Sequence, residues 1–247
     1  MNPFVYAILL ALAASLANVL GGVIVTTHKW ALRSLRYFIA LGSGFMLGAI
    51  FLEMVPESLR MSPELAGRFT APTTLLLLGY LIVHAFEHTF ASHLHFGEET
   101  HHEEVTNPVV GISALVGMLV HTYFDGVAIG VSFLVSDSVG TLVFLAVLLH
   151  KIPDGFTIAS IAMSSGYSKG KALSSAIALG ISTLLGVISI HIFPGLKPYA
   201  LPISAGSLLY VAATDLMPEV NHEKGVKMAL VVFAGIGLFL LLQLAVE

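Results

Sequence analysis

Two copies of one histidine-to-aspartate spacing lie in the middle of the chain. Both read His-x-x-x-Asp-Gly, the first from His121 to Asp125 and the second from His150 to Asp154. Residues four apart stack on one face of a helix, so each copy places an imidazole one turn from a carboxylate. Zinc accepts these nitrogen and oxygen donors in tetrahedral geometry, and the same donors suit iron(II), manganese and cobalt. The spacing therefore predicts a divalent-metal site shared by two helices.

The composition indicates that these helices lie in a membrane. Hydrophobic residues make up 56% of the 247 residues and charged residues 11%, whereas soluble domains carry about 25% charged residues. The sequence contains no cysteine, which excludes disulfides and thiolate ligands. Its net charge of −4 argues against a nucleic-acid partner. The expected partner is a lipid bilayer.

Apolar runs between polar breaks predict an all-α polytopic membrane protein with one transmembrane domain over residues 1–247. Because each span needs roughly 20 apolar residues, we expect eight spans, near residues 4–25, 37–56, 72–91, 108–134, 139–162, 171–192, 199–217 and 226–246.

Basic residues in the connecting loops predict the orientation of these spans. One side carries Lys29, Arg33, Arg36, Lys169, Lys171, Lys224 and Lys227, and the other carries Arg60, Arg68 and Lys197. The positive-inside rule makes the richer side cytoplasmic, so both termini are expected on the other side of the membrane, outside the cytoplasm. The expected location of the protein is the cytoplasmic (plasma) membrane.

A second repeat relates distant spans. Residues 44–57 resemble residues 206–219, with a glycine, an acid, a proline and a glutamate in register 162 residues apart. On the expected topology the two copies run in opposite directions, which is the inverted repeat of many secondary transporters. Chance similarity of two apolar helices that end in Pro-Glu is the alternative.

Charge at the bilayer centre supports an ion site. A single charge there costs at least about 2.5–3.5 kcal/mol, and Asp125, Lys151 and Asp154 all fall near the middle of their spans. A bound dication would compensate the carboxylates. The alternative is that His121 and His150 only hydrogen-bond to the aspartates, but the repeated spacing favours an ion site.

Further polar residues outline an entrance or exit route for a cation. Glu53 and Asp215 lie deep in spans 2 and 7, and His84, Glu87 and His88 share one face near the cytoplasmic end of span 3. The loop at residues 93–107 contains His93, His95, His101 and His102. It is either a loose cytoplasmic zinc-binding tract or a solvated connector.

These residues together resemble the ZIP family of divalent-metal transporters and, within it, the GufA-like branch. The family carries His-Asn-x-Pro-Glu-Gly on its fourth span and a related motif on its fifth. The resemblance covers essentially the whole chain and implies a 3+2+3 order of spans, a metal site at His121, Asp125, His150 and Asp154, and a homodimer. It also implies an elevator-like motion of spans 1, 4, 5 and 6 against spans 2, 3, 7 and 8.

The chain departs from the family pattern at several positions. Thr122 stands where the family often has asparagine, Phe124 replaces proline, and aspartate replaces glutamate at 125 and 154. Lys151 occupies the place of an acidic ligand that completes a second site in two-metal members. We therefore predict a single-metal site in which the Lys151 ammonium pairs with Asp125 or Asp154 in place of a second ion.

The expected function is zinc uptake into the cytoplasm. Zn²⁺ is the expected substrate, Fe²⁺, Mn²⁺, Cd²⁺ and Co²⁺ are further candidates, and no organic cofactor is expected. Two other classes remain open at this point. A membrane zinc metallohydrolase would use the same ligands to activate water, and a proton-coupled exchanger would use His and Asp as a metal-free relay.

Overall fold

The computed structural model describes residues 3–27, 32–61, 71–90, 108–221 and 226–246, and all regular elements in these residues are helical. The elements are α1 (Pro3–Thr27), α2 (Leu32–Gly48), η1 (Ala49–Met54), α3 (Val55–Met61), α4 (Pro72–Phe90), α5 (Pro108–Val135), α6 (Asp137–Ser164), α7 (Lys169–Ile192), η3 (Pro194–Leu196), α8 (Lys197–Tyr210), η4 (Val211–Leu216), α9 (Met217–Asn221) and α10 (Val226–Val246).

Among the described residues, helices lie in each of the eight ranges expected from the sequence, and six helices are long and apolar enough to cross a membrane. These six are Phe4–Thr27, Arg36–Met61, Gly111–Val135, Asp137–Ser164, Lys169–Ile192 and Val226–Val246. The other two expected spans correspond to α4 and to α8 through α9. They carry polar groups within their apolar runs, among them Glu87 and Asp215, which lower their hydropathy.

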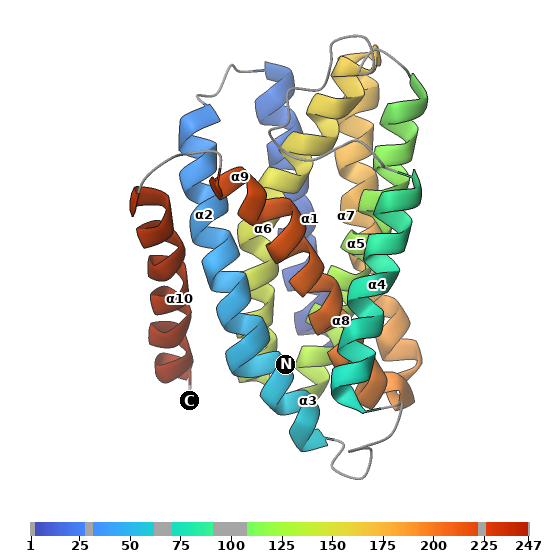
Figure 1. The fold of residues 1–247 in the computed structure, drawn as a ribbon. Coiled ribbons are helices and arrows are strands. Elements are labelled where there is room, and N and C mark those ends of the chain that lie inside the picture. The colour runs from blue at the N-terminus through green and yellow to red at the C-terminus, as the bar shows by residue number, and fades with distance from the viewer. Residues whose placement is uncertain (1–2, 28–31, 62–70, 91–107, 222–225, 247) are drawn as a thin grey trace.

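The helices form one elongated bundle (Figure 1). Helix α1 packs on α6 and α7, α5 packs on α6 and α7, α2 packs on α10, and α4 packs on α8. Large apolar side chains cover much of the outside: Leu16, Phe233 and Leu244 are 63%, 67% and 74% exposed. Such a surface suits lipid, because lipid tails solvate it without the cost that water imposes.

Two π-helical segments interrupt the helices that contain the repeated sequences. The backbone N–H of Val55 donates to the carbonyl of Ile50 in η1, and that of Met217 donates to Ala212 in η4. The two segments lie at the same 162-residue offset as the sequence repeat. Isolated π-helical turns are rare and occur frequently at functional sites; here one contains Glu53 and the other Asp215.

Candidate metal centre

A one-residue break between α5 and α6 brings the two His-x-x-x-Asp motifs together. Ser136 separates the helices and caps α6, because its hydroxyl accepts a hydrogen bond from the backbone N–H of Val139 at 3.1 Å. So short a connection makes α5 and α6 antiparallel neighbours. The motifs then face each other from positions of similar depth.

The four side chains meet in the interior, and we call them the metal centre: His121, Asp125, His150 and Asp154. Their ligand atoms all lie within 4.8 Å of one another. Nε2 of His121 lies 3.2 Å from Asp154 Oδ2 and 3.7 Å from Asp125 Oδ2. Nε2 of His150 lies 3.3 Å from Asp125 Oδ2 and 3.7 Å from Asp154 Oδ2.

These separations fit a tetrahedral ion. Donors bound about 2.0–2.2 Å from zinc in tetrahedral geometry lie roughly 3.3–3.6 Å from one another. The four nitrogen-to-oxygen distances, 3.2 to 3.7 Å, span that interval. The second carboxylate oxygen of Asp125 is buried and has no hydrogen-bonding partner among the described residues. It keeps its lone pairs for a cation.

The backbone of α6 fixes the orientation of His150. Its Nδ1–H donates to the carbonyl of Ala146 at 3.1 Å, so in the neutral ring Nε2 carries the lone pair. That lone pair faces carboxylate oxygens, which are acceptors as well. Acceptors that face one another are favourable only with a cation among them, and the Lys151 ammonium supplies one positive charge there. A backbone-held imidazole is the usual support for a metal ligand.

His121 is held by a carboxylate instead. Its Nδ1 lies 3.4 Å from Oε1 of Glu87 on α4. Glu87 in turn lies close to Asp215 of η4, and the ligand atoms of Glu87, His121 and Asp215 are within 4.8 Å of one another. We call these three residues the boundary cluster. His121 therefore belongs to the metal centre through one ring nitrogen and to the boundary cluster through the other.

Lys151 completes the charges around the metal centre. Its ammonium donates to Oδ2 of Asp125 and, at 2.9 Å, to Oδ2 of Asp154. The side chain is fully buried, and no member of the metal centre is more than 2% exposed. The sequence predicted that Lys151 pairs with Asp125 or Asp154, and the ammonium contacts both.

The other residues expected on the route lie apart from the metal centre. The rings of His84 and His88 stack 5.4 Å apart on an exposed face of α4. Glu53 of η1 accepts a hydrogen bond from Nε2 of Gln243 on α10 at 2.7 Å. His93, His95, His101 and His102, in the loop at 93–107, lie outside the described residues.

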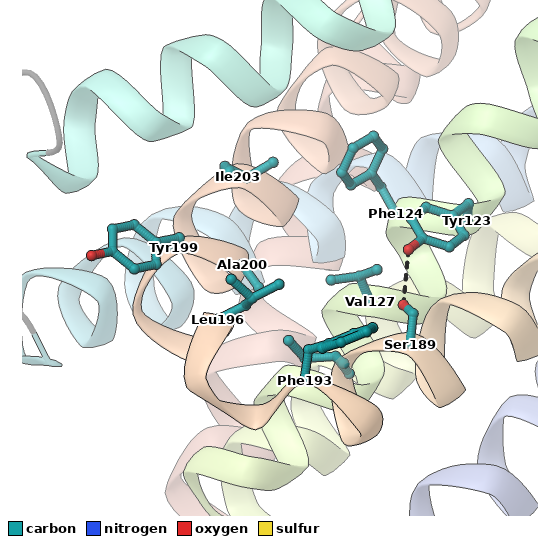
Figure 2. A pocket seen from close by; sticks show the side chains of 10 residues that line it. Tyr123, Phe124, Val127, Ser189, Phe193, Leu196, Tyr199, Ala200 and Ile203 are labelled. Atoms are coloured by element: carbon teal, nitrogen blue, oxygen red, sulfur yellow. Dashed lines mark hydrogen bonds between the residues drawn. The ribbon is translucent and has the colours of Figure 1, made fainter.

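A separate cavity of about 290 Å³ lies between α5, α7 and α8. Figure 2 shows its lining, in which the Tyr123 hydroxyl and the Ser189 hydroxyl hydrogen-bond to each other at 2.8 Å. The rest is largely apolar, including Phe124, Val127 and Phe193. The lining contains no carboxylate or imidazole, which are the donors that the metal centre combines.

Comparison with known sequences gives this centre a context. The sequence model described as ZIP Zinc transporter matches residues 97–243, a stretch that covers more than half of the chain and contains the whole metal centre. The chain belongs to this ZIP family. Its members are transporters rather than enzymes, which answers the metallohydrolase alternative. Metal-ion transport is the function class, and the chain is an integral membrane protein.

Individual ZIP relatives match over different shares of their length. Zinc transporter ZIP13 of Pongo abelii is 28% identical over 236 residues, which cover 88% of this chain and 69% of that protein. Zinc transporter ZIP9 of Xenopus tropicalis is 24% identical over 267 residues, covering 90% and 87%. Zinc transporter ZIP9 of Micropogonias undulatus is 29% identical over 160 residues, and the chain spans half of that protein.

The boundary cluster is the feature that reading the sequence did not assemble. Glu87 and Asp215 were each expected on the route toward the cytoplasmic end of their spans, but not in contact with each other or with His121. Their contact with His121 depends on how α4 and η4 pack against α5. The i, i+4 periodicity reports one helix at a time, so the sequence held no signal for a cluster drawn from three elements.

Proposed function

We propose that this ZIP protein carries Zn²⁺ into the cytoplasm through His121, Asp125, His150 and Asp154. The observation that carries the proposal is the convergence of two imidazole nitrogens on two buried carboxylates at separations suited to one tetrahedral ion. The relatives are described as zinc transporters, which supports zinc as the substrate. The same donors make Fe²⁺, Mn²⁺, Cd²⁺ and Co²⁺ the alternatives to test.

One ion occupies the metal centre at a time in this proposal. Lys151 adds a positive charge beside both aspartates, and a second dication next to it would be repelled. The ammonium thus takes the place of a second ion. Two buried carboxylates and one ammonium leave one negative charge unbalanced, which a single dication more than compensates.

The proposed fold has eight spans in a 3+2+3 order with inverted symmetry. Close glycine contacts support it, because they recur with the two partners exchanged. A Cβ on Gly44 would collide with Val232, and one on Gly206 with Leu76; likewise Gly79 meets Ile203, and Gly235 meets Leu41. In the first set the two glycines are 162 residues apart and their two partners 156 residues apart. In the second set the glycines are 156 residues apart and the partners 162. Two halves that pack alike in this way suit a carrier that faces each side of the membrane in turn.

Elevator-type alternating access is the proposed motion. One body comprises α1, α5, α6 and α7, and the other comprises α2 to α4 and α8 to α10. Among the described glycines, every contact tighter than 3.0 Å joins helices of the same body, as Gly155 does with Asn18 and Gly126 with Thr183. Across the boundary, Gly42 and Leu149 meet at an ordinary 3.5 Å. Tight packing within each body and looser packing between them favours sliding at that boundary.

The proposed setting is a homodimer in the cytoplasmic membrane with both termini outside. In Figure 1 the start of α1 and the end of α10 lie toward the same end of the bundle, which supports an even number of spans. With this orientation Glu53 lies toward the outer mouth. Asp215, Glu87, His84 and His88 lie toward the inner one, where acids and imidazoles receive the ion.

Uptake of ⁶⁵Zn²⁺ by proteoliposomes tests the proposal. We expect His150→Ala to abolish saturable uptake in protein that stays folded. His191→Ala is the matched control, because His191 also donates Nδ1–H to the carbonyl four residues before it, at 2.9 Å, but lies outside the metal centre. Equal uptake by the two variants would refute the site. A metal-free proton relay predicts no saturable zinc flux in the wild type.

The pH dependence of uptake follows from the same ligands. Histidine binds metal only when it is deprotonated, so protons compete with Zn²⁺. We expect uptake to fall as the pH drops below about 6. Rates measured from pH 8 to pH 5 at fixed free Zn²⁺ check this, and a flat profile would show that histidine is not a ligand.

A further inference from the structure

The cavity between α5, α7 and α8 has an interior that suits an apolar guest. Its volume of about 290 Å³ is close to the lower end of the range for ligand sites. The Tyr123 hydroxyl donates to the Ser189 hydroxyl at 2.8 Å, and Ser189 donates to the carbonyl of Gly186 at 2.8 Å. Both hydroxyl protons are therefore used within the protein. A cavity lined in this way favours an apolar molecule over water.

The cavity extends from the surface of the bundle toward its interior. Phe193 and Leu196 of its lining are 59% and 53% exposed, whereas Val127 and Ala200 are buried. In Figure 2 the hydroxyl of Tyr199 points away from the other lining side chains. A tyrosine with an apolar ring against the protein and a polar tip outside is typical of the membrane–water interface. The mouth of the cavity therefore faces the region where lipid headgroups meet lipid chains.

A lysine stands at this mouth. Lys197 begins α8, directly after the lining residue Leu196. The preceding span in α7 ends at Ile192, so Lys197 lies at the membrane surface. Its ammonium donates to the carbonyl of Leu134, at the end of α5, at 2.7 Å. An ammonium has three N–H donors, and this hydrogen bond uses one of them, so the others can bind an anion.

We propose that this cavity binds an anionic phospholipid, with one acyl chain inside the cavity and the phosphate on Lys197. The two parts of such a lipid meet their complements in the right order, because the cation is at the membrane surface and the apolar space lies below it. A zwitterionic lipid carries its own cation beside the phosphate and gains less from the ammonium. This site does not depend on the proposed function.

The cavity also lies between the two bodies of the proposed elevator. Phe124 and Ile190 belong to the body with α5 and α7, whereas Ala200 belongs to the body with α8. The hydrogen bond from Lys197 to Leu134 crosses the same boundary. A lipid that contacts both bodies in this arrangement stabilises it relative to arrangements that distort the cavity. The bound lipid therefore slows transport, and this consequence rests on the proposed function.

Binding of radiolabelled phosphatidylglycerol to delipidated protein in detergent tests the site. We expect saturable binding that phosphatidylcholine with the same acyl chains displaces poorly. Lys197→Gln should weaken it by roughly tenfold, the loss of a hydrogen bond to a charged group, and Lys197→Arg should retain it. Lys169→Gln is the matched control, because Lys169 also donates to the last turn of a helix, at the carbonyl of Thr26, but lies at the opposite end of α7. It should bind like the wild type.

A second pair of variants tests the acyl-chain position. Ala200→Phe places a ring in the cavity and should abolish binding, and Ile203→Trp fills the same space from its edge if Ala200→Phe does not fold. Gly237→Phe is the control, since nothing lies within 4 Å of an added Cβ there. Equal binding of the two lipids, or binding unchanged in Lys197→Gln or in the folded cavity variant, would overturn the site.

Uptake of ⁶⁵Zn²⁺ separates this inference from the proposed function. Replacing phosphatidylglycerol by phosphatidylcholine in proteoliposomes should raise the maximal rate of the wild type more than that of Lys197→Gln. The surface charge of the vesicles acts on both proteins alike, so the comparison removes it. An equal response of the two proteins would show that the lipid does not slow transport. Wild-type protein that binds phosphatidylglycerol but shows no saturable uptake in either lipid would refute the proposed function and leave the lipid site standing.

Discussion

The segment from α2 to α3 and the segment from α8 to α9 place an acid in the same kind of backbone but give it different neighbours. Glu53 in η1 accepts a hydrogen bond from the amide of Gln243. Asp215 in η4 lies beside the carboxylate of Glu87 and the imidazole of His121. The glycine contacts relate α4 to α10 by 156 residues, and this offset makes Gln243 the counterpart of Glu87.

One difference in side-chain chemistry separates the two places. An amide satisfies a carboxylate by donating a hydrogen bond, and the pair needs no ion. A second carboxylate cannot donate when ionised, so the pair of acids is favourable only with a cation or a proton between them. The comparison teaches that a duplicated backbone supplies two equivalent positions, and that the residue opposite the acid decides whether the acid is paired through a hydrogen bond or faces another carboxylate.

The same contrast appears within the metal centre and gives the largest expected effect. Lys151 and Thr122 each follow a ligand histidine, but Lys151 pairs with both aspartates. Lys151→Thr would make the second motif like the first and leave two buried carboxylates uncompensated. Removing one partner of a buried ion pair costs about 3–5 kcal/mol, and thermal unfolding in chelator should register it. Zn²⁺ should restore the stability, with more than one ion bound per subunit.

The control for that variant is Lys169→Thr. Lys169 donates a 2.8 Å hydrogen bond to the carbonyl of Thr26 and lies outside the metal centre. We expect it to cost about 0.5–1.5 kcal/mol, the ordinary contribution of one hydrogen bond, with no response to zinc. If Lys151→Thr melts like Lys169→Thr in chelator, Lys151 is not the compensating charge.

Glu87→Gln would give the second segment the chemistry of the first. It removes one of the two carboxylates of the boundary cluster, the one that lies beside Nδ1 of the ligand His121. Loss of such a partner lowers metal affinity or activity by roughly 10- to 100-fold, so kcat/KM for ⁶⁵Zn²⁺ uptake should fall by about that factor. Glu53→Gln, in the equivalent place, should have a much smaller effect. Similar losses in both variants would mean that the segments are equivalent.

Gln243→Glu is the reverse exchange. It sets a second carboxylate against Glu53 in place of the donor amide. We expect the variant to unfold at a lower temperature than the wild type in chelator and to gain more stability on addition of Zn²⁺. A melting temperature unaffected by zinc would show that two acids in this backbone are not enough to bind a cation.

The smallest effect concerns the packing that the two segments share. Gly206 lies against the backbone of Leu76, and an added Cβ would collide with its carbonyl. Gly206→Ala should lower the free energy of unfolding by about 1–3 kcal/mol, as overpacking does. Gly237→Ala is the control, because nothing lies within 4 Å of its added Cβ. It should be neutral or stabilising by up to about 1 kcal/mol.

The sequence predicted the helices well because their pattern is local. The expected span at residues 108–134 matches Pro108–Val135. The chain reverses its direction at Ser136, between the two His-x-x-x-Asp motifs. The four residues of the metal centre were also within reach, since His and Asp four apart need only one helix each. By length and hydropathy, six of the described helices qualify as membrane spans; α4 and the segment from α8 to α9, which carry Glu87 and Asp215, are not among them.

The π-helical segments and the boundary cluster were out of reach for a physical reason. A π-helical turn shifts backbone hydrogen bonds by one residue, and the side chains of η1 and η4 contain no pattern that reports this. The contact between Glu87 and His121 joins residues 34 apart across two helices. The distance between α4 and α5 depends on the packing of the whole bundle, including Gly79 and Gly206.

The buried ammonium of Lys151 has an electrical consequence for a transport cycle. With neutral imidazoles, the two aspartates and Lys151 carry a net charge of −1, and one bound dication changes it to +1. Moving one elementary charge across the membrane changes its free energy by about 2.3 kcal/mol for each 100 mV of membrane potential. If the centre moves as in the proposed elevator, an inside-negative voltage would pull the loaded centre inward and push the empty one outward, so it would speed both halves of the cycle.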